Sequence, residues 1–386
     1  MYKSIKELGI YISDGNYSSK YPRSEEFVDE GIPFIRGNNM IDGEIVDEDM
    51  YHITEEKHSI LLKGHVQTGD VLITTRGNIG QVAIIPERHD DSNINAQIVL
   101  LRVNKDELHN RYLLWALQSH KSKEQYLALQ TGTALKQLPV GKLEQVKIKY
   151  VDLQSQFEVA EILDKAYQII KIRKKELLAL DDLIKARFVA LFGDPASNPN
   201  GYPKKSLPEI AEYWNGLTYK PEDVSEEGTI VLRSSNIQNA TLDFEDTVRV
   251  ACKIGANKYV QDNDILMCSR NGSARLVGKV ALIKNLEEPM SFGAFMMIIR
   301  SEYYSYLMTY FQLPAFRAQI TTGATTTINQ ITGRMLDVVK LPVPDLDTVS
   351  EFEKFVKQVD KSKVAVKKAL DEAQLLFDSF MQKYFG

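Results

Sequence analysis

The chain has 386 residues, 44% of them hydrophobic and 26% charged, which is the composition of a globular protein with material for two or three domains. The formal net charge of −5 argues against a surface that grips nucleic acid everywhere, but it permits local basic patches. Two cysteines, Cys252 and Cys268, cannot build a disulfide framework. No apolar signal region or membrane-spanning run is present, so we expect a cytoplasmic protein.

The most informative feature of the sequence is an internal repeat. Leu191-Phe192-Gly193 ends the first half, and Tyr384-Phe385-Gly386 ends the second half 193 residues later. Three phrases recur in the same order: Phe34 to Asn39 and Val231 to Asn236, Gly69 to Arg76 and Asn263 to Arg270, and Thr131-Gly132-Thr133 and Thr322-Gly323-Ala324. Units of this size are too large for a solenoid. We therefore predict a pseudo-dimer of two domains, an arrangement that suits a target with two halves.

Residues 1–150 are predicted to form a mixed domain of short strands. Apolar runs around Ile73, at Val82 to Ile85 and at Ile98 to Val103 are separated by Gly, Pro and Asn, and a helix covers Tyr112 to Leu117. The second half repeats this order. It has strands at Lys279 to Ile283 and Ala294 to Ile299, and a helix near Tyr303 to Phe311 that Pro314 ends or kinks.

Each half closes with a seven-residue apolar repeat. The seams of the first half are Gln156, Leu163, Ile170, Leu177, Ile184, Leu191 and Val159, Ala166, Arg173, Leu180, Arg187; those of the second are Val349, Val356, Lys363, Leu370, Phe377, Tyr384 and Phe352, Val359, Val366, Ala373, Phe380. Five heptads predict two coiled-coil helices of roughly 38 residues, about 57 Å each. We expect them to pack antiparallel on each other and to hold the two domains apart. The alternative is that each helix folds back on its own domain.

Three polar residues interrupt these seams: Arg173, Arg187 and Lys363. Such residues either fix the register of a helix pair or contact a partner. Between the halves, a connector rich in proline and glycine runs from Gly193 to Pro203 and stops the first helix. The predicted fold class is α+β, with a domain at 1–150, a helix at 151–193, a linker and second domain at 194–345, and a helix at 346–386.

Side chains that pair with base edges and phosphates cluster at the predicted strand ends. The candidates are Arg36, Asn38, Asn39, Arg76, Asn78, Lys136 and Gln137 in the first half, and Arg233, Ser235, Asn236, Arg270, Asn271, Arg275, Thr326 and Asn329 in the second. Gly77 and Gly132 would let backbone approach a phosphate closely. The alternative is that these are ordinary polar turns, in which Asn39 and Asn236 cap local backbone.

A search for catalytic motifs is negative. No Asn-Pro-Pro-Tyr-like motif, no glycine-rich turn for S-adenosylmethionine, and no Walker-type or HExxH pattern is present. Glu55-Glu56-Lys57 after Asp47 weakly resembles a nuclease acid-x-lysine pair, but in so acidic a segment we interpret it as solvated surface. The six histidines show no metal-ligand spacing. We predict no catalytic residue, cofactor or metal on this chain.

Several phrases together carry a family resemblance. They are the connector Leu191-Phe192-Gly193-Asp194-Pro195 with the following Asn198 to Pro203, the Arg-x-x-Asn phrases at Ile35 to Asn39 and Leu232 to Asn236, and the Thr-Gly segments before each long helix. In this order and duplication, the whole chain resembles the specificity subunits of type I restriction–modification systems. It departs from a strict repeat at Arg270 to Arg275, which has extra residues relative to Arg76 to Gly80.

The resemblance implies two target recognition domains that each read one half of a split double-stranded DNA site, and spacer helices that act as a ruler. It also implies two methyltransferase (M) subunits docked around the helices, and restriction/translocase (R) subunits. S-adenosylmethionine, ATP and Mg are then expected on those partners. Apolar residues beside the main seam, namely Ile162, Ile169, Leu183 and Phe188, are predicted to face a methyltransferase subunit or a globular domain.

Two other functions stay open. One is a stand-alone nuclease or methyltransferase with an unrecognised site. The other is a coiled-coil adaptor, which is disfavoured because its globular parts would not need duplicated Arg/Asn loops.

Overall fold

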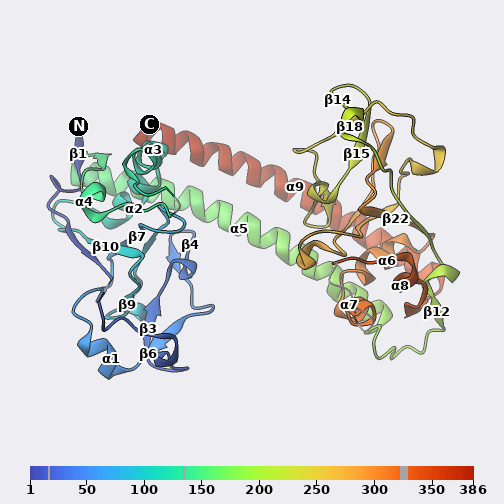
Figure 1. The fold of residues 1–386 in the computed structure, drawn as a ribbon, viewed down its shortest axis with the longest axis horizontal. Coiled ribbons are helices and arrows are strands. Elements are labelled where there is room, and N and C mark those ends of the chain that lie inside the picture. Colours follow the sequence, from blue (N-terminus) through green and yellow to red (C-terminus); the bar gives the residue numbers. More distant parts are fainter. Residues whose placement is uncertain (16–17, 134, 322–328) are drawn as a thin grey trace. The chain divides into compact units, whose positions relative to one another are not determined.

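The computed structural model describes residues 1–15, 18–133, 135–321 and 329–386. The chain divides into two compact units, residues 1–174 with 368–386, and residues 175–367. Both units combine a small sheet-rich domain with segments of the two long helices, α5 (Leu153–Phe192) and α9 (Leu346–Phe385) (Figure 1). The fold class is α+β, as predicted.

Unit 1 is built mainly from short strands. In chain order its elements are β1 (Tyr2–Ser4), β2 (Tyr11–Asp14), β3 (Ile32–Ile35), β4 (Met40–Ile41), β5 (Glu44–Ile45), β6 (Tyr51–Ile53), α1 (Glu55–Ile60), β7 (Val71–Thr74), β8 (Val82–Ile84), β9 (Asn93–Ile94), β10 (Ile98–Arg102), α2 (Asn110–Gln118), α3 (His120–Leu129), α4 (Val140–Leu143) and β11 (Lys147–Lys149). The main sheet has the order β2-β10-β7-β8 and is antiparallel. A second sheet has the order β6-β3-β9, in which β3 and β9 are parallel.

Unit 2 repeats these elements almost one for one. They are β12 (Lys204–Ser206), β13 (Glu212–Asn215), β14 (Val224–Ser225), β15 (Thr229–Leu232), β16 (Ile237–Gln238), β17 (Thr241–Leu242), β18 (Arg249–Val250), β19 (Ile265–Cys268), β20 (Val280–Leu282), β21 (Met290–Phe292), β22 (Met296–Arg300), α6 (Tyr304–Tyr310), α7 (Pro314–Thr321), α8 (Gly333–Asp337) and β23 (Lys340–Pro342). Its main sheet, β13-β22-β19-β20, matches that of unit 1, and its second sheet adds β14 to the equivalent β18-β15-β21 order. The repeat in the sequence is therefore a repeat of topology.

The two halves of the chain are interlocked through the ends of the long helices. In unit 1 the core includes Leu163 from the start of α5 and Phe385 from the end of α9. In unit 2 it includes Phe352 from the start of α9 and Phe192 from the end of α5. Phe385 lies 5.2 Å from the ring of Tyr112, and Phe192 lies 5.0 Å from the ring of Tyr306. Each domain thus buries the last aromatic residue of the other half's helix.

The long helices pack antiparallel within each unit. In unit 2, Arg187 pairs with Glu351 at 2.5 Å and Asp181 pairs with Lys363 at 2.5 Å, so the numbering rises along one helix as it falls along the other. In unit 1, the ring of Tyr167 on α5 lies 5.7 Å from that of Phe377 on α9. The alternative of two helices folded independently on their own domains is therefore wrong. Two of the polar seam residues, Arg187 and Lys363, form ion pairs across the helix pair, which favours register fixing over partner contact.

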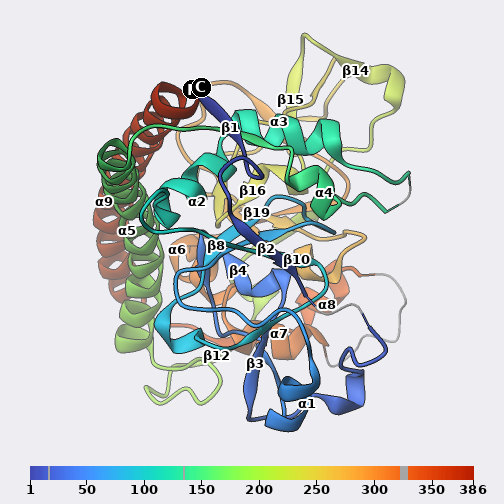
Figure 2. The same cartoon turned by 90° about the vertical axis from the view of Figure 1, so that its left-hand side faces the viewer.

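A cluster of polar contacts joins α2 to the first part of α5 within unit 1. Arg111 of α2 makes a bidentate pair with Asp164 of α5, with a shortest distance of 2.5 Å, and the indole of Trp115 donates to the same carboxylate at 2.7 Å. Figure 2 shows α2 beside α5 in this unit. Since bidentate charge-assisted hydrogen bonds are the stronger kind, they orient the helix as well as hold it.

The predicted strands and helices are confirmed, and the differences concern Pro314 and several short helices. The predicted strands and the helix at Tyr112 to Leu117 correspond to β7, β8, β10, β20, β22 and α2. Pro314 does not kink a helix: α6 ends at Tyr310, and Pro314 begins α7, where a missing N–H costs nothing. The short helices α1, α3, α4, α7 and α8 are not among the predicted elements. The four predicted segment boundaries stay a prediction, because the compact units divide each long helix between them. No helix among the described residues is long and apolar enough to span a membrane.

Candidate nucleic-acid interface

The Arg-x-x-Asn phrases form matching 3₁₀ turns, Gly37–Asn39 and Ser234–Asn236. Asn39 accepts from the backbone N–H of Arg36 at 3.1 Å and donates to the carbonyls of Val46 and Glu48. Asn236 does the same with Arg233, Asp243 and Asp246. Both carboxamides are fully buried and have donors and acceptors engaged. These contacts favour the alternative in which Asn39 and Asn236 cap local backbone and hold the turns in shape.

The arginines that open these turns are tied to their own domains. The guanidinium of Arg36 lies 3.4 Å from the ring centroid of Tyr51 and donates to the carbonyl of Asp49 at 2.6 Å. Arg233 pairs with the carboxylate of Asp246 at 2.7 Å. Contact of either arginine with DNA would have to replace these interactions, whereas Asn38 in the same turn is exposed and Ser235 is half-buried.

The second cluster follows the central strand of each main sheet. Arg76 comes two residues after β7 and is half-buried, and Arg270 comes two residues after β19 and is exposed. The backbone at Gly77 has a φ of +70°, and a Cβ added there would meet nothing within 4 Å, so a phosphate could approach it closely. Among the remaining candidates here, Asn78 and Arg275 are exposed, whereas Asn271 is half-buried and donates to the hydroxyl of Ser234 at 3.1 Å.

The third cluster lies on the segment before α4 or α8. Thr131 and Gln137 exchange two backbone hydrogen bonds of 2.8 and 2.9 Å and close a tight loop that presents Lys136 to solvent. Gly132 is required by this turn, because a Cβ there would lie 2.3 Å from the carbonyl oxygen of Leu135. In unit 2, Asn329 is half-buried and donates to the carbonyl of Gly272 at 3.1 Å. Thr326 and the Thr322-Gly323-Ala324 phrase lie outside the described residues.

Each unit brings its three clusters together. In unit 2, Asn271 joins the 3₁₀ turn through Ser234, and Arg270 forms a backbone bridge with Gln330. In unit 1, Arg76 forms the equivalent bridge with Gln137. A Cβ at Gly37 of the 3₁₀ turn would lie 3.5 Å from Thr74 at the end of β7. Segments about 100 residues apart thus form one polar surface in each unit, as expected of a recognition site built from loops on a rigid sheet.

An open cleft adjoins this surface in unit 1. It has a volume of about 450 Å³, and its walls include Asp42, Asn78, Gln81, Lys123 and Tyr167. These side chains offer both hydrogen-bond donors and acceptors.

The sequence did not indicate two residues that flank the equivalent arginines. Phe295 is 58% exposed, and its ring lies 5.3 Å below the guanidinium of Arg270. Its carbonyl accepts from Ser269, as the carbonyl of the exposed Gln97 accepts from Thr75 in unit 1. Gln97 and Phe295 therefore occupy the same place beside Arg76 and Arg270. An exposed aromatic residue next to an arginine is a signal that sequence alone could not give, since β22 brings the two together.

The comparisons with known proteins agree with this architecture. A family model described as the type I restriction modification DNA specificity domain matches residues 2–181. The chain is 22% identical over 385 residues to the type I restriction enzyme EcoKI specificity subunit of Escherichia coli K12, covering 92% of this chain and 82% of that protein. It is 23% identical over 324 residues to the MjaVIII specificity subunit of Methanocaldococcus jannaschii, covering 76% of this chain and 73% of that protein.

Another relative is matched over a shorter stretch. This is a putative type I restriction enzyme MjaX specificity subunit of Methanocaldococcus jannaschii, 26% identical over 191 residues. The match covers 48% of this chain and spans less than half, 44%, of that relative's length.

Solved structures share the fold at low sequence identity. The S subunit of a type I restriction-modification system from M. genitalium has a TM-score of 0.58 at 15% identity, covering 100% of this chain and 96% of that one. A chain from a study of complex assembly and conformational transition in a type I R-M system has a TM-score of 0.56 at 16% identity, with 100% and 97% covered. Residues 2–181 therefore match the type I restriction modification DNA specificity domain, and the whole chain shares the fold of type I specificity subunits. We assign no catalytic step to this chain.

Proposed function

We propose that this chain reads a bipartite double-stranded DNA site, one half-site per unit, and carries the methyltransferase and restriction subunits of its complex. The observation that supports this most directly is the convergence of three polar segments in each unit, with the same order and topology in both. Arginine, lysine, asparagine and glutamine at such a surface supply the donors and acceptors that base edges and phosphates require. A local surface of this kind is compatible with a net charge of −5, because partner subunits share the phosphate contacts.

The long helices are the proposed docking surface for two methyltransferase subunits, one for each half. Apolar side chains stay exposed along them, including Ile169 and Leu183 at 46% and Val364 and Leu375 at 71%. Phe188 takes the second of the two expected roles, since it is fully buried in the core of unit 2 and completes the junction with that domain. S-adenosylmethionine, ATP and Mg belong, in this proposal, to the methyltransferase and restriction subunits.

The proposed role of the helices as a ruler gives a direct experiment. Each is 40 residues long, about 60 Å at the standard rise. Seven residues inserted in both helices, after Lys174 and after Lys367, preserve the heptad seam and lengthen the pair by roughly 10 Å, about three base pairs. The expected result is a methylated site with the same two half-sequences and a spacer about three base pairs longer. Methylome sequencing of a host that carries the full set of subunits measures it.

Two controls accompany this experiment. Seven residues inserted in the connector between Gly193 and Pro203 should leave the spacer unchanged, because the connector is not part of the helix pair. Native mass spectrometry should find two methyltransferase subunits per chain in every variant. An unchanged spacer in an assembled, active double-insertion variant contradicts the ruler, and methylation by the purified chain alone would instead favour a stand-alone enzyme.

A further inference from the structure

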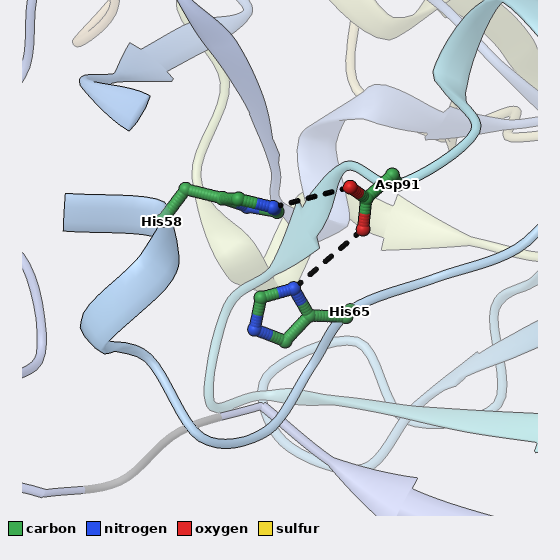
Figure 3. Close-up of side chains that lie close together, drawn as sticks. All are labelled: His58, His65 and Asp91. Carbon is green, nitrogen blue, oxygen red and sulfur yellow. Dashed lines mark ion pairs between the residues drawn. The ribbon is translucent and has the colours of Figure 1, made fainter. Parts of the chain in front are cut away.

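Two histidines and an aspartate lie close together in unit 1 (Figure 3). His58 lies on α1, His65 follows it in the next loop, and Asp91 lies in the turn before β9. One ligand atom from each lies within 4.8 Å of the others. The histidine side chains are only 13% and 32% exposed, whereas that of Asp91 is 73% exposed. The expectation of no metal site rested on spacing along the sequence, in which the three residues form no pattern.

The outer nitrogen of each imidazole already has a partner. Nε2 of His65 lies 2.6 Å from the carbonyl oxygen of Leu61, which can only accept, so this nitrogen donates. Nδ1 of His58 donates to the carboxamide oxygen of Asn93 at 2.5 Å. In the neutral imidazoles, Nε2 of His58 and Nδ1 of His65 therefore carry the lone pairs, and both face the carboxylate of Asp91. Three electron-pair donors that face one another require a positive charge between them.

The distances distinguish a metal ion from protons as the source of that charge. Nε2 of His58 is 3.4 Å from one oxygen of Asp91, and Nδ1 of His65 is 3.7 Å from the other. A direct charge-assisted hydrogen bond would be about 2.7–2.9 Å long. Ligands bonded at about 2.0–2.1 Å in tetrahedral geometry stand roughly 3.3–3.4 Å apart. The two nitrogen–oxygen distances, each to a different oxygen of Asp91, lie at or just above this value, and the three candidate ligand atoms lie within 4.8 Å of one another. Partners on the outer nitrogens, such as Leu61 and Asn93, are also what metal-binding histidines ordinarily have.

We propose that His58, His65 and Asp91 bind one divalent transition-metal ion of the zinc class. Two imidazoles and one carboxylate leave a coordination position for water, on the side where Asp91 is exposed. The ion would link α1, the segment after it and the turn before β9, and so fasten the β6-β3-β9 sheet. The backbone already favours this geometry: Asp91 has a φ of +55°, and its N–H donates to the carbonyl of Val66 at 2.9 Å.

Unit 2 provides an internal comparison. His65 forms a backbone bridge with Asn93, and at the same place Tyr259 forms a bridge with Ser291. All six histidines of the chain lie in its first 120 residues, so unit 2 offers no imidazole. The proposal therefore requires one site per chain, not two.

The test uses the full chain, stripped with EDTA and titrated with Zn²⁺ against a chromophoric chelator, and with Co²⁺ for its visible absorption. The expected result is one equivalent bound with a Co²⁺ spectrum of low coordination number, and a higher melting temperature with Zn²⁺ than with EDTA. His58→Ala and His65→Ala should lose the site. Asn93→Ala, which removes a partner of His58 and no ligand, should weaken binding about 10- to 100-fold.

Matched controls make the outcome decisive. His120→Ala removes a histidine that is 82% exposed and pairs only with Glu124, and it should bind Zn²⁺ like the parent chain. Asp91→Asn changes a largely exposed side chain, so it tests the site even where a histidine variant fails to fold. Zn²⁺ uptake that is absent, or that falls equally in His120→Ala and Asp91→Asn, overturns the proposal.

Discussion

The two units share their interiors and differ at their surfaces. Each has the same order of strands in its main sheet, the same buried asparagine in its 3₁₀ turn, and the same pair of a buried aspartate with the arginine that ends a strand of the main sheet. In that pair, Arg102 meets Asp70 and Arg300 meets Asp264, both through two hydrogen bonds of 2.7–2.8 Å. The hydrogen bonds to these carboxylates raise the pKa of both guanidiniums.

At the surface, equivalent positions of the two units carry different residues. Gln97 of unit 1 corresponds to Phe295 of unit 2, and His65 corresponds to Tyr259. Glutamine can make paired hydrogen bonds to adenine, whereas an aromatic ring offers apolar contact to a thymine methyl. In the proposed function, one scaffold therefore carries two different reading surfaces. A change inside one unit should then affect the fold of that unit, whereas a change on its surface should affect only what it reads.

The largest expected effect tests the interlocking of the halves. Phe385→Ala and Phe192→Ala each remove a buried ring and should cost about 3–5 kcal/mol. Although Phe385 ends the second half in sequence, its loss should loosen unit 1, and loss of Phe192 should loosen unit 2. Hydrogen–deuterium exchange followed by mass spectrometry locates the change: α2 and β11 in the first case, α6 and β23 in the second.

A suitable control is Leu178→Ala, since Leu178 lies on α5 and is 65% exposed. A surface change of this kind should stay within about 0.5 kcal/mol. Faster exchange in the same unit for both phenylalanine variants would refute the interlocked arrangement.

A smaller effect is expected for the equivalent arginines of the reading surfaces. Arg76→Ala should relax base preference in one half-site and Arg270→Ala in the other, each by about 1–3 kcal/mol. Binding of the assembled complex to DNA altered in each half-site, at one fixed salt concentration, measures this. Relaxation of the same half-site by both variants would contradict one half-site per unit. Equal weakening on every sequence would mean that these arginines hold phosphates, and Asn78, Lys136 and Asn271 would be the next to test.

The smallest effect concerns the starts of the two long helices. The hydroxyl and N–H of Ser155 donate to Asp152, and the N–H and hydroxyl of Thr348 donate to Asp345, which lowers the pKa of both carboxyls. A carboxyl with a lowered folded-state pKa stabilises the fold above its unfolded pKa, about 3.9, and loses this as pH falls through the folded value. Asp152→Asn and Asp345→Asn should therefore lower the melting temperature relative to the parent chain. This decrease should be largest at pH 7 and become smaller as the pH falls below about 4. If the difference in melting temperature between variant and parent chain did not change with pH, the charge of these carboxylates would not be its cause.

The sequence predicted the long helices well because their apolar period is regular over five heptads. The heptads of Val349 to Tyr384 indicated a helix that the structure places at Leu346–Phe385. The repeated phrases also indicated the segments that we propose to read DNA. They could not distinguish Asn38, which is exposed, from Asn39, which is buried one residue later, because a repeat preserves structural and functional residues alike.

Long-range contacts account for the rest. Phe295 comes to lie beside Arg270 only through the register of β22 with β19, in which Met296 faces Cys268. His65 and Asp91 are brought together by the backbone bridge between His65 and Asn93, and His58 joins them through its contact with Asn93. The spacing of the three residues along the chain matches no motif. Sequence patterns reveal regular spacing between residues that are close along the chain. Neither of these two groups of residues has such a spacing.

The start of the chain and the end of α9 lie in the same unit. Met1 and Gly386 belong to the same unit, where the N-terminal amino group donates to the carbonyl of Tyr150 at 3.3 Å. A short flexible linker between the two ends, with a new opening in the connector after Gly193, would keep the strand pairs and helix contacts of both units. We therefore expect a circularly permuted gene, or two half-genes expressed together, to specify the same contacts within each unit.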